Sequence, residues 1–163
     1  VLNDKCENTH VINSLDVPVL CMGLKDVVVA ASPEGVLVSD KGESSYIKPY
    51  VDKFDQQIMF AEKSWGNYLV IDATADSLTV KVTLHQGSKM NYHSHERRDE
   101  SWNIISGTGR VIVDGTERTV KAGDIVSLPV GCRHTVYAET ELQIIEVQFG
   151  KDIDVHDKIK HEL

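Results

Sequence analysis

Several kinds of segment are missing from this chain of 163 residues. No apolar run approaches the about 20 residues that a membrane-spanning helix needs, and no charged stretch leads into an apolar signal segment with a cleavage site. Basic residues are few: 17 Lys and Arg stand against 25 Asp and Glu, for a net charge of −8. These absences argue against a helical membrane protein, and against nucleic acid or an anionic membrane as the main partner.

Cysteine is also scarce. Cys6, Cys21 and Cys132 are widely spaced, and no two of them form a Cys-x-x-Cys pair. An odd number of dispersed cysteines predicts reduced thiols and a cytoplasmic protein. The composition, 41% hydrophobic and 26% charged, is typical of a soluble globular protein with one domain and an appendage. Because the chain begins with Val1 and not with methionine, we expect a processed product or a part of a longer protein.

Short β-rich runs with even spacing dominate residues 56–150. The stretch SLTVKVTLH (77–85) alternates apolar and polar residues, which is typical of a strand with one buried face. Asp114 and Gly115 lie between two apolar runs and predict a hairpin turn. The pattern predicts an all-β barrel or sandwich of antiparallel strands over 56–150. For the charged tail, 151–163, we expect a helical or frayed segment at the surface.

The first third of the chain has a different pattern. Residues 1–42 alternate short β-rich runs with turn signals such as Ser-Pro-Glu-Gly. Residues 43–55 place Ile47, Val51 and Phe54 at helical spacing, which predicts a linking helix. An appendage this short cannot bury a core of its own. We therefore expect it to pack against a partner domain or a second subunit, and we expect a homodimer.

The strongest chemical signal is a set of three histidines and one glutamate. His93 and His95 lie two residues apart, so on a strand both side chains point to the same face. Glu100 follows closely, and His134 begins a later β run after a Pro-x-Gly turn. Alone, the two neighbouring histidines would more often belong to a solvated loop. The set of four is a mixed nitrogen and oxygen donor set, which predicts a divalent transition metal such as Zn, Mn, Fe, Co or Ni.

Two runs of fixed spacing contain these four residues. Their nine positions are Gly87, His93, His95, Glu100 and Gly107 in the first run, and Gly123, Pro129, Gly131 and His134 in the second. These runs match both signature motifs of the cupin superfamily, except that Ala138 stands where the second motif ends in Asn. The chain thus resembles a cupin. The resemblance implies a double-stranded β-helix, or jelly-roll barrel, with a metal inside its mouth.

A narrower resemblance covers nearly the whole chain. It is carried by SWGNY (64–68), Lys81, Arg98, Glu100, Trp102, SGTGRVIVDG (106–115) and IEVQFG (145–150). With these residues the chain resembles the C-terminal half of type II mannose-6-phosphate isomerases, which usually follow a GDP-mannose pyrophosphorylase domain. Residues 1–42 are similar to the segment that links the two activities. The resemblance implies the back end of a bifunctional mannose-1-phosphate guanylyltransferase/mannose-6-phosphate isomerase. The chain has no glycine-rich phosphate loop, so we expect no nucleotide transfer by this chain alone.

The implied reaction interconverts mannose 6-phosphate and fructose 6-phosphate, and moves a proton between adjacent carbons through an enediolate. A metal at the four predicted ligands would supply an electrophile for the developing oxyanion. Arg98 and Lys81 are the predicted catalytic and substrate-binding residues, since arginine offers a planar fork to phosphate and lysine a point charge. The candidates for the catalytic base are Glu96, Asp99 and His85, and nothing in the sequence ranks them. Arg133 and Tyr92 are further substrate-binding candidates.

Two other functions are compatible with the sequence. Three histidines and a glutamate around Fe(II) are also the site of an oxygenase, but a basic cluster at the barrel mouth would favour a phosphorylated sugar. The other alternative is a non-catalytic sugar-binding or oligomerisation module joined to a nucleotidyltransferase domain. Metal content and analysis of bound ligands distinguish this module from the two enzymes.

Overall fold

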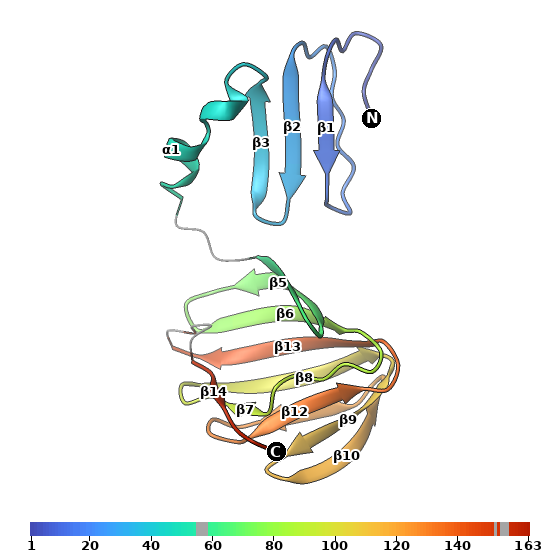
Figure 1. Ribbon diagram of the computed structural model, residues 1–163, viewed down its shortest axis with the longest axis vertical. Helices are drawn as coiled ribbons and strands as arrows, with labels where there is room; N and C mark the ends of the chain where they lie inside the picture. Colours follow the sequence, from blue (N-terminus) through green and yellow to red (C-terminus); the bar gives the residue numbers. More distant parts are fainter. Residues whose placement is uncertain (55–58, 152, 154–156) are drawn as a thin grey trace. The chain divides into compact units, whose positions relative to one another are not determined.

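The computed structural model describes residues 1–54, 59–151, 153 and 157–163. It divides the chain into two compact units, Val1–Met59 and Phe60–Leu163. The first unit is a small sheet with a short helix, and the second consists of two larger sheets (Figure 1). Among the described residues no helix is long and apolar enough to cross a membrane. The part of the chain that the structure describes is mostly β with one short α-helix, which confirms the predicted fold class.

The first unit contains a three-stranded sheet. Strand β1 (His10–Asn13) is parallel to β2 (Val27–Ser32), and β2 forms an antiparallel hairpin with β3 (Gly35–Asp40). Three apolar side chains are buried in the described part of this unit, namely Cys21, Val29 and Ala31. So small a core agrees with the expectation that this segment packs against a partner, which stays a prediction.

The linking helix is shorter than the sequence predicts. Instead of a helix over 43–55, the chain forms a 3₁₀ turn (Ser44–Tyr46) and one turn of α-helix, α1 (Lys48–Val51). Residue 55 lies outside the described residues. A single turn is a marginal helix because few hydrogen bonds offset the cost of its nucleation. Pro49 lies in the first turn of α1, where its missing N–H costs little.

The second unit is built from two antiparallel sheets. One has the strand order β11-β8-β13-β6-β5-β4, and the other has the order β10-β9-β12-β7-β14. The strands are β4 (Phe60–Lys63), β5 (Gly66–Ala73), β6 (Ser77–Leu84), β7 (His93–Ser94), β8 (Arg98–Ser106), β9 (Thr108–Val113), β10 (Thr116–Lys121), β11 (Ile125–Leu128), β12 (His134–Ala138), β13 (Leu142–Gly150) and β14 (Ile159–Lys160).

The core of this unit lies between its two sheets. Val80, Val82 and Leu84 alternate along β6 with more exposed residues, as the sequence predicts, and all three are buried. They belong to one apolar cluster with Trp102 of β8 in the same sheet and Val136 of β12 in the other. Because both sheets turn their apolar faces to this cluster, the inward side chains of β7, β8, β12 and β13 approach one another.

The described part of the C-terminal tail is not helical. Ile159 and Lys160 form β14, which pairs antiparallel with β7 and extends the five-stranded sheet (Figure 1). The expectation of a helical or frayed tail is therefore wrong for these residues. The edge of β7 presents backbone N–H and C=O groups that need partners, and the tail supplies them.

The turns of the second unit depend on glycine at particular positions. Asp114 and Gly115 have φ angles of 47° and 79° and join β9 to β10, which confirms the predicted hairpin. Gly107, between β8 and β9, has a φ of +83°, and a Cβ built there would lie 2.0 Å from the carbonyl oxygen of Glu141. At Gly115 a Cβ would meet nothing within 4 Å.

This difference predicts unequal effects of alanine at the two turns. Gly115→Ala should lower the free energy of unfolding by about 1 kcal/mol, the cost of a non-glycine residue in the left-handed region. Gly107→Ala should cost clearly more, because the backbone of Glu141 has to move as well. Chemical denaturation of both variants measures the difference. Equal losses would show that the close approach at Gly107 is unimportant.

Candidate metal centre

Three buried histidines meet inside the second unit. His93 lies on β7, His95 follows that strand directly, and His134 begins β12, where it is the pairing partner of His93. Their ring centroids are 4.3 to 5.4 Å apart, and one nitrogen from each ring lies within 4.8 Å of the others. The structure therefore brings together the three imidazoles that the sequence predicts as ligands, and this group can hold a metal ion.

Each imidazole is fixed by a backbone carbonyl. Nδ1 of His93 lies 2.6 Å from the oxygen of Asn91, and Nδ1 of His134 lies 3.2 Å from the oxygen of Cys132. Nδ1 of His95 contacts the carbonyl oxygen of Asp157. A carbonyl only accepts hydrogen bonds, so each Nδ1 carries the hydrogen and each Nε2 keeps its lone pair. The three Nε2 atoms thus turn their lone pairs to one place, where that of His95 also accepts from Nη2 of Arg98.

Glu100 on β8 lies against two of these nitrogens. Its Oε1 is 3.0 Å from Nε2 of His95, and its Oε2 is 3.5 Å from Nε2 of His134. Nε2 of His134 is buried and has no hydrogen-bond partner among the described residues. Contacts between a carboxylate and the lone pair of an imidazole are favourable only when a cation, either a proton or a metal ion, lies between them. The donor set therefore fits a divalent metal.

The electrostatics of the cluster also suit a cation. Burial, and next the positive charge of Lys158, lowers the pKa of His93 to about 3, so this imidazole is neutral near pH 7. Burial alone would raise the pKa of Glu100, but its contacts with His134 and His95 and the charge of Arg98 hold it well below its usual value. A neutral imidazole and an ionised carboxylate are the forms that bind metals.

Arg98 is the one predicted catalytic residue that lies within this cluster. Its Nε donates to Oε1 of Glu100 at 2.9 Å, and its Nη2 is 3.2 Å from Nε2 of His95. Trp102 donates from Nε1 to the other oxygen of Glu100 at 3.2 Å. The guanidinium and the indole thereby fix both oxygens of the carboxylate, so Arg98 orients a predicted ligand whether or not it also binds substrate.

The other predicted site residues are not part of the histidine cluster. Lys81 alternates with Val80 and Val82 along β6, so its side chain lies on the opposite, outer face of the sheet. Glu96 and Arg133 are exposed, and the hydrogen bonds that fix them are made by their backbones, to Asp157 and Asp114. Tyr92 is half-buried and packs edge-on against His161, with 6.2 Å between ring centroids.

Two buried polar residues near the cluster were not identified from the sequence. Glu146 and Gln148 are buried on the inner face of β13, where they pair with Trp102 and Glu100 of β8. Gln148 donates from Nε2 to Oε1 of Glu146 at 2.5 Å. Burial, with the charge of Glu100 next, raises the pKa of Glu146 to about 8. The sequence pattern does not mark them, because both faces of β13 carry apolar residues.

Comparison with known proteins agrees with this geometry. The family model "Mannose-6-phosphate isomerase C-terminal" matches residues 52–162. The chain belongs to this family. The predicted resemblance to the isomerase C-terminal part is therefore confirmed, and residues 52–162 include all three histidines and Glu100.

Relatives of this family member are longer proteins. A putative mannose-1-phosphate guanylyltransferase of Vibrio cholerae is 28% identical over 153 residues, which are 88% of this chain and 33% of that protein. Mannose-1-phosphate guanylyltransferase ManC of Salmonella typhimurium is 27% identical over 171 residues, 99% of this chain and 35% of that protein. The chain thus spans about a third of the length of these relatives.

A solved structure agrees on the fold. An RmlC-like cupin from Shewanella frigidimarina has a TM-score of 0.53 and 20% identity, over 61% of this chain and 90% of that one. This likeness confirms the predicted cupin fold and carries no information on substrate.

Proposed function

We propose that this chain is a metal-dependent isomerase domain that interconverts mannose 6-phosphate and fructose 6-phosphate in the synthesis of GDP-mannose. The observation that carries the proposal is the buried histidine cluster, whose three Nδ1 atoms are tied to carbonyls so that three Nε2 lone pairs converge. The description of the matching family supports the substrate.

In this proposal His93, His95, His134 and Glu100 hold a divalent transition metal. When bound, the metal supplies an electrophile for the sugar oxygen that gains negative charge as the proton leaves the neighbouring carbon. Arg98 keeps the carboxylate of Glu100 aimed at the imidazoles through its 2.9 Å hydrogen bond. Burial of the cluster excludes water from the place where this charge develops.

Positive charge near the cluster supports a phosphorylated substrate. The charge of Lys158 lowers the pKa of His93, and the charge of Arg98 lowers that of Glu100. Because the guanidinium of Arg98 is engaged with Glu100, we assign Lys158, which is exposed, as the residue that binds the phosphate. Burial raises the pKa of Glu146 to about 8, so its carboxyl is protonated near pH 7 and is a neutral hydrogen-bond donor on the inner face of β13.

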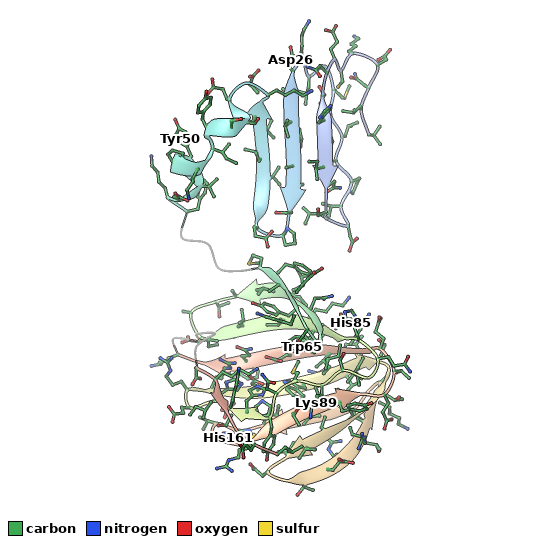
Figure 2. All side chains as sticks on the ribbon, viewed as in Figure 1. Asp26, Tyr50, Trp65, His85, Lys89 and His161 are labelled. Atoms are coloured by element: carbon green, nitrogen blue, oxygen red, sulfur yellow. The ribbon has the colours of Figure 1, made fainter. Side chains whose placement is uncertain are left out.

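An assay of mannose 6-phosphate turnover tests the proposal. The purified chain is stripped of metal with a chelator, and Zn, Mn, Fe(II), Co and Ni are added back separately. We expect at least one metal to restore turnover, and His134→Ala to abolish it. His85→Ala is the matched control, because His85 is exposed and its side chain lies outside the cluster (Figure 2).

A second candidate function is a non-catalytic, metal-stabilised sugar-binding module. It is favoured by the placement of Lys81 and Glu96, which do not lie with the histidines although the sequence predicts them as catalytic. On this interpretation the loaded chain binds mannose 6-phosphate in a calorimeter but converts none of it. Binding without turnover for every metal would replace the isomerase proposal by this one.

The activity of a longer protein is a separate proposal. Two relatives named as mannose-1-phosphate guanylyltransferases are about three times as long as the matched region. We propose that this domain works together with a nucleotidyltransferase domain, against which the first unit packs its exposed apolar residues, among them Val36 and Val38.

A further inference from the structure

The C-terminal segment Asp157–His161 follows the metal-binding stretch residue by residue. Ile159 and Lys160 pair with Ser94 and His93. The amide of His161 donates to the carbonyl of Tyr92 at 2.9 Å. Every contact of this ladder lies on the stretch that contains two of the three histidines.

Side chains strengthen the same ladder. Nε2 of His161 lies 2.8 Å from the hydroxyl of Ser94, and the two rings of His161 and Tyr92 meet edge-on. Figure 2 labels His161 on the C-terminal segment, at the barrel. On its other side β7 is paired with β12 at only one register position, between His93 and His134. The segment therefore supplies much of the support that keeps β7 in place.

Asp157 makes the contacts that reach the metal centre itself. Its carbonyl oxygen accepts from Nδ1 of His95 and so fixes the tautomer and the direction of this ring. Its carboxylate accepts from the backbone N–H of Glu96 at 3.0 Å and of Arg97 at 3.1 Å. Oδ2 is also 4.0 Å from Nη1 of Arg98, the residue that orients Glu100. Asp157 is 7% exposed, so these contacts are made away from solvent.

We propose that Asp157 is a positioning residue of the metal centre, and that the segment Asp157–His161 is a strap whose docking and metal binding support each other. The inference rests on the metal site of the proposed function, but not on isomerase activity. A strap that orients His95 raises the affinity for the metal, and by thermodynamic linkage the bound metal stabilises the docked strap by the same factor.

Metal affinity of strap variants tests the inference. Asp157→Asn keeps the size and the backbone carbonyl, but its NH₂ group cannot accept from a backbone N–H. We expect its dissociation constant for Zn²⁺ and Co²⁺ to rise about tenfold to a hundredfold, as is found when outer partners of metal ligands are lost. The absorption spectrum of bound Co²⁺ should change too, which a loss of fold stability alone would not cause. Lys160→Ala, at an exposed position of β14, is the matched control.

Two shortened chains distinguish the contribution of the strap to metal binding from that of the last two residues. A chain that ends at residue 156 should bind metal more weakly than Asp157→Asn, because it also loses the carbonyl that holds His95. A chain that ends at His161 loses only Glu162 and Leu163, which follow the last strap contact, and should bind normally. Wild-type affinity in both Asp157→Asn and the chain ending at 156 would overturn the inference.

Hydrogen exchange of the wild-type chain gives a test that needs no variant. The amides of Glu96, Arg97 and His161 donate the hydrogen bonds that join the strap to the stretch around β7. Adding Zn²⁺ should slow their exchange, but not that of the Thr74 amide in the β5–β6 turn. Unchanged exchange at all four amides with metal bound would overturn the linkage. If the wild-type chain binds no metal, the inference and the proposed metal site both fail. Metal binding that depends on Asp157 without turnover would support the strap and remove only the isomerase.

Discussion

Replacement of Glu100 by glutamine should remove most of the affinity for divalent metal. The carboxylate is 3% exposed and lies 3.0 and 3.5 Å from the Nε2 atoms of His95 and His134. Its negative charge therefore attracts any cation that is bound there. We expect the dissociation constant to rise by more than about a hundredfold, the upper limit for residues that only support a ligand. Titration of the metal-stripped variant with Zn²⁺ or Co²⁺ measures this change.

The same substitution should also destabilise the metal-free protein. Loss of the charge breaks the buried ion pair of 2.9 Å between Glu100 and Arg98, and breaking a buried pair on one side costs about 3 kcal/mol, less whatever the contact of Arg98 with Asp157 retains. Glu96→Gln removes an exposed carboxylate four residues earlier and is the matched control. A loss of affinity between about tenfold and a hundredfold would make Glu100 a supporting residue and not a ligand. Unchanged affinity would remove it from the metal centre.

The shared face of His93 and His95 could be predicted from local rules, whereas their meeting with His134 was implied by the resemblance to cupins. Two histidines at i and i+2 share a face of any strand, and the alternation along 77–85 identified which faces of the barrel are apolar. The glycine positions fixed the turns between strands, as Gly107 with its φ of +83° shows. The alternation and the positive φ angles are local features, so a single sequence contains them.

It was harder to predict from the sequence which face of a strand points into the barrel. Lys81 was assigned to the site although it stands on the polar face of its strand, and in a barrel with an apolar interior that face points outward. Glu146 and Gln148 were overlooked because both faces of β13 carry apolar residues, so alternation alone does not show which face is buried. Only the register against Trp102 and Glu100 places these two side chains inside.

The strap could not be predicted from the sequence at all. Asp157 contacts His95 across 62 residues of chain, and pairing at that separation leaves no local pattern. A charged tail is usually a solvated end, which is why a frayed segment or a helix was expected. The contact forms because β7 presents a free edge and an imidazole N–H that needs an acceptor.

Glu146→Gln should stabilise the protein, and increasingly so as the pH rises. Burial, and after it the charge of Glu100, raises the pKa of Glu146 from 4.5 to about 8 in the folded chain, against the opposing effects of Gln148, Arg98 and Lys158. Between these two values the folded state keeps a proton that the unfolded state releases. The free energy of unfolding of the wild type therefore falls with rising pH in this window, by up to about 1.4 kcal/mol per pH unit.

Glutamine has no such proton to lose. The variant and the wild type should have similar stability below a pH of about 4.5, where both side chains are uncharged in both states. The difference should then grow to several kcal/mol and level off above a pH of about 8, once Glu146 ionises in the folded protein too. Urea denaturation of metal-free protein at a series of pH values measures it, with the exposed Glu141→Gln as the control. A difference that stays constant from pH about 4 to 8 would mean that the interior solvates the Glu146 carboxylate, and that the polar pair on β13 is open to water in the folded state.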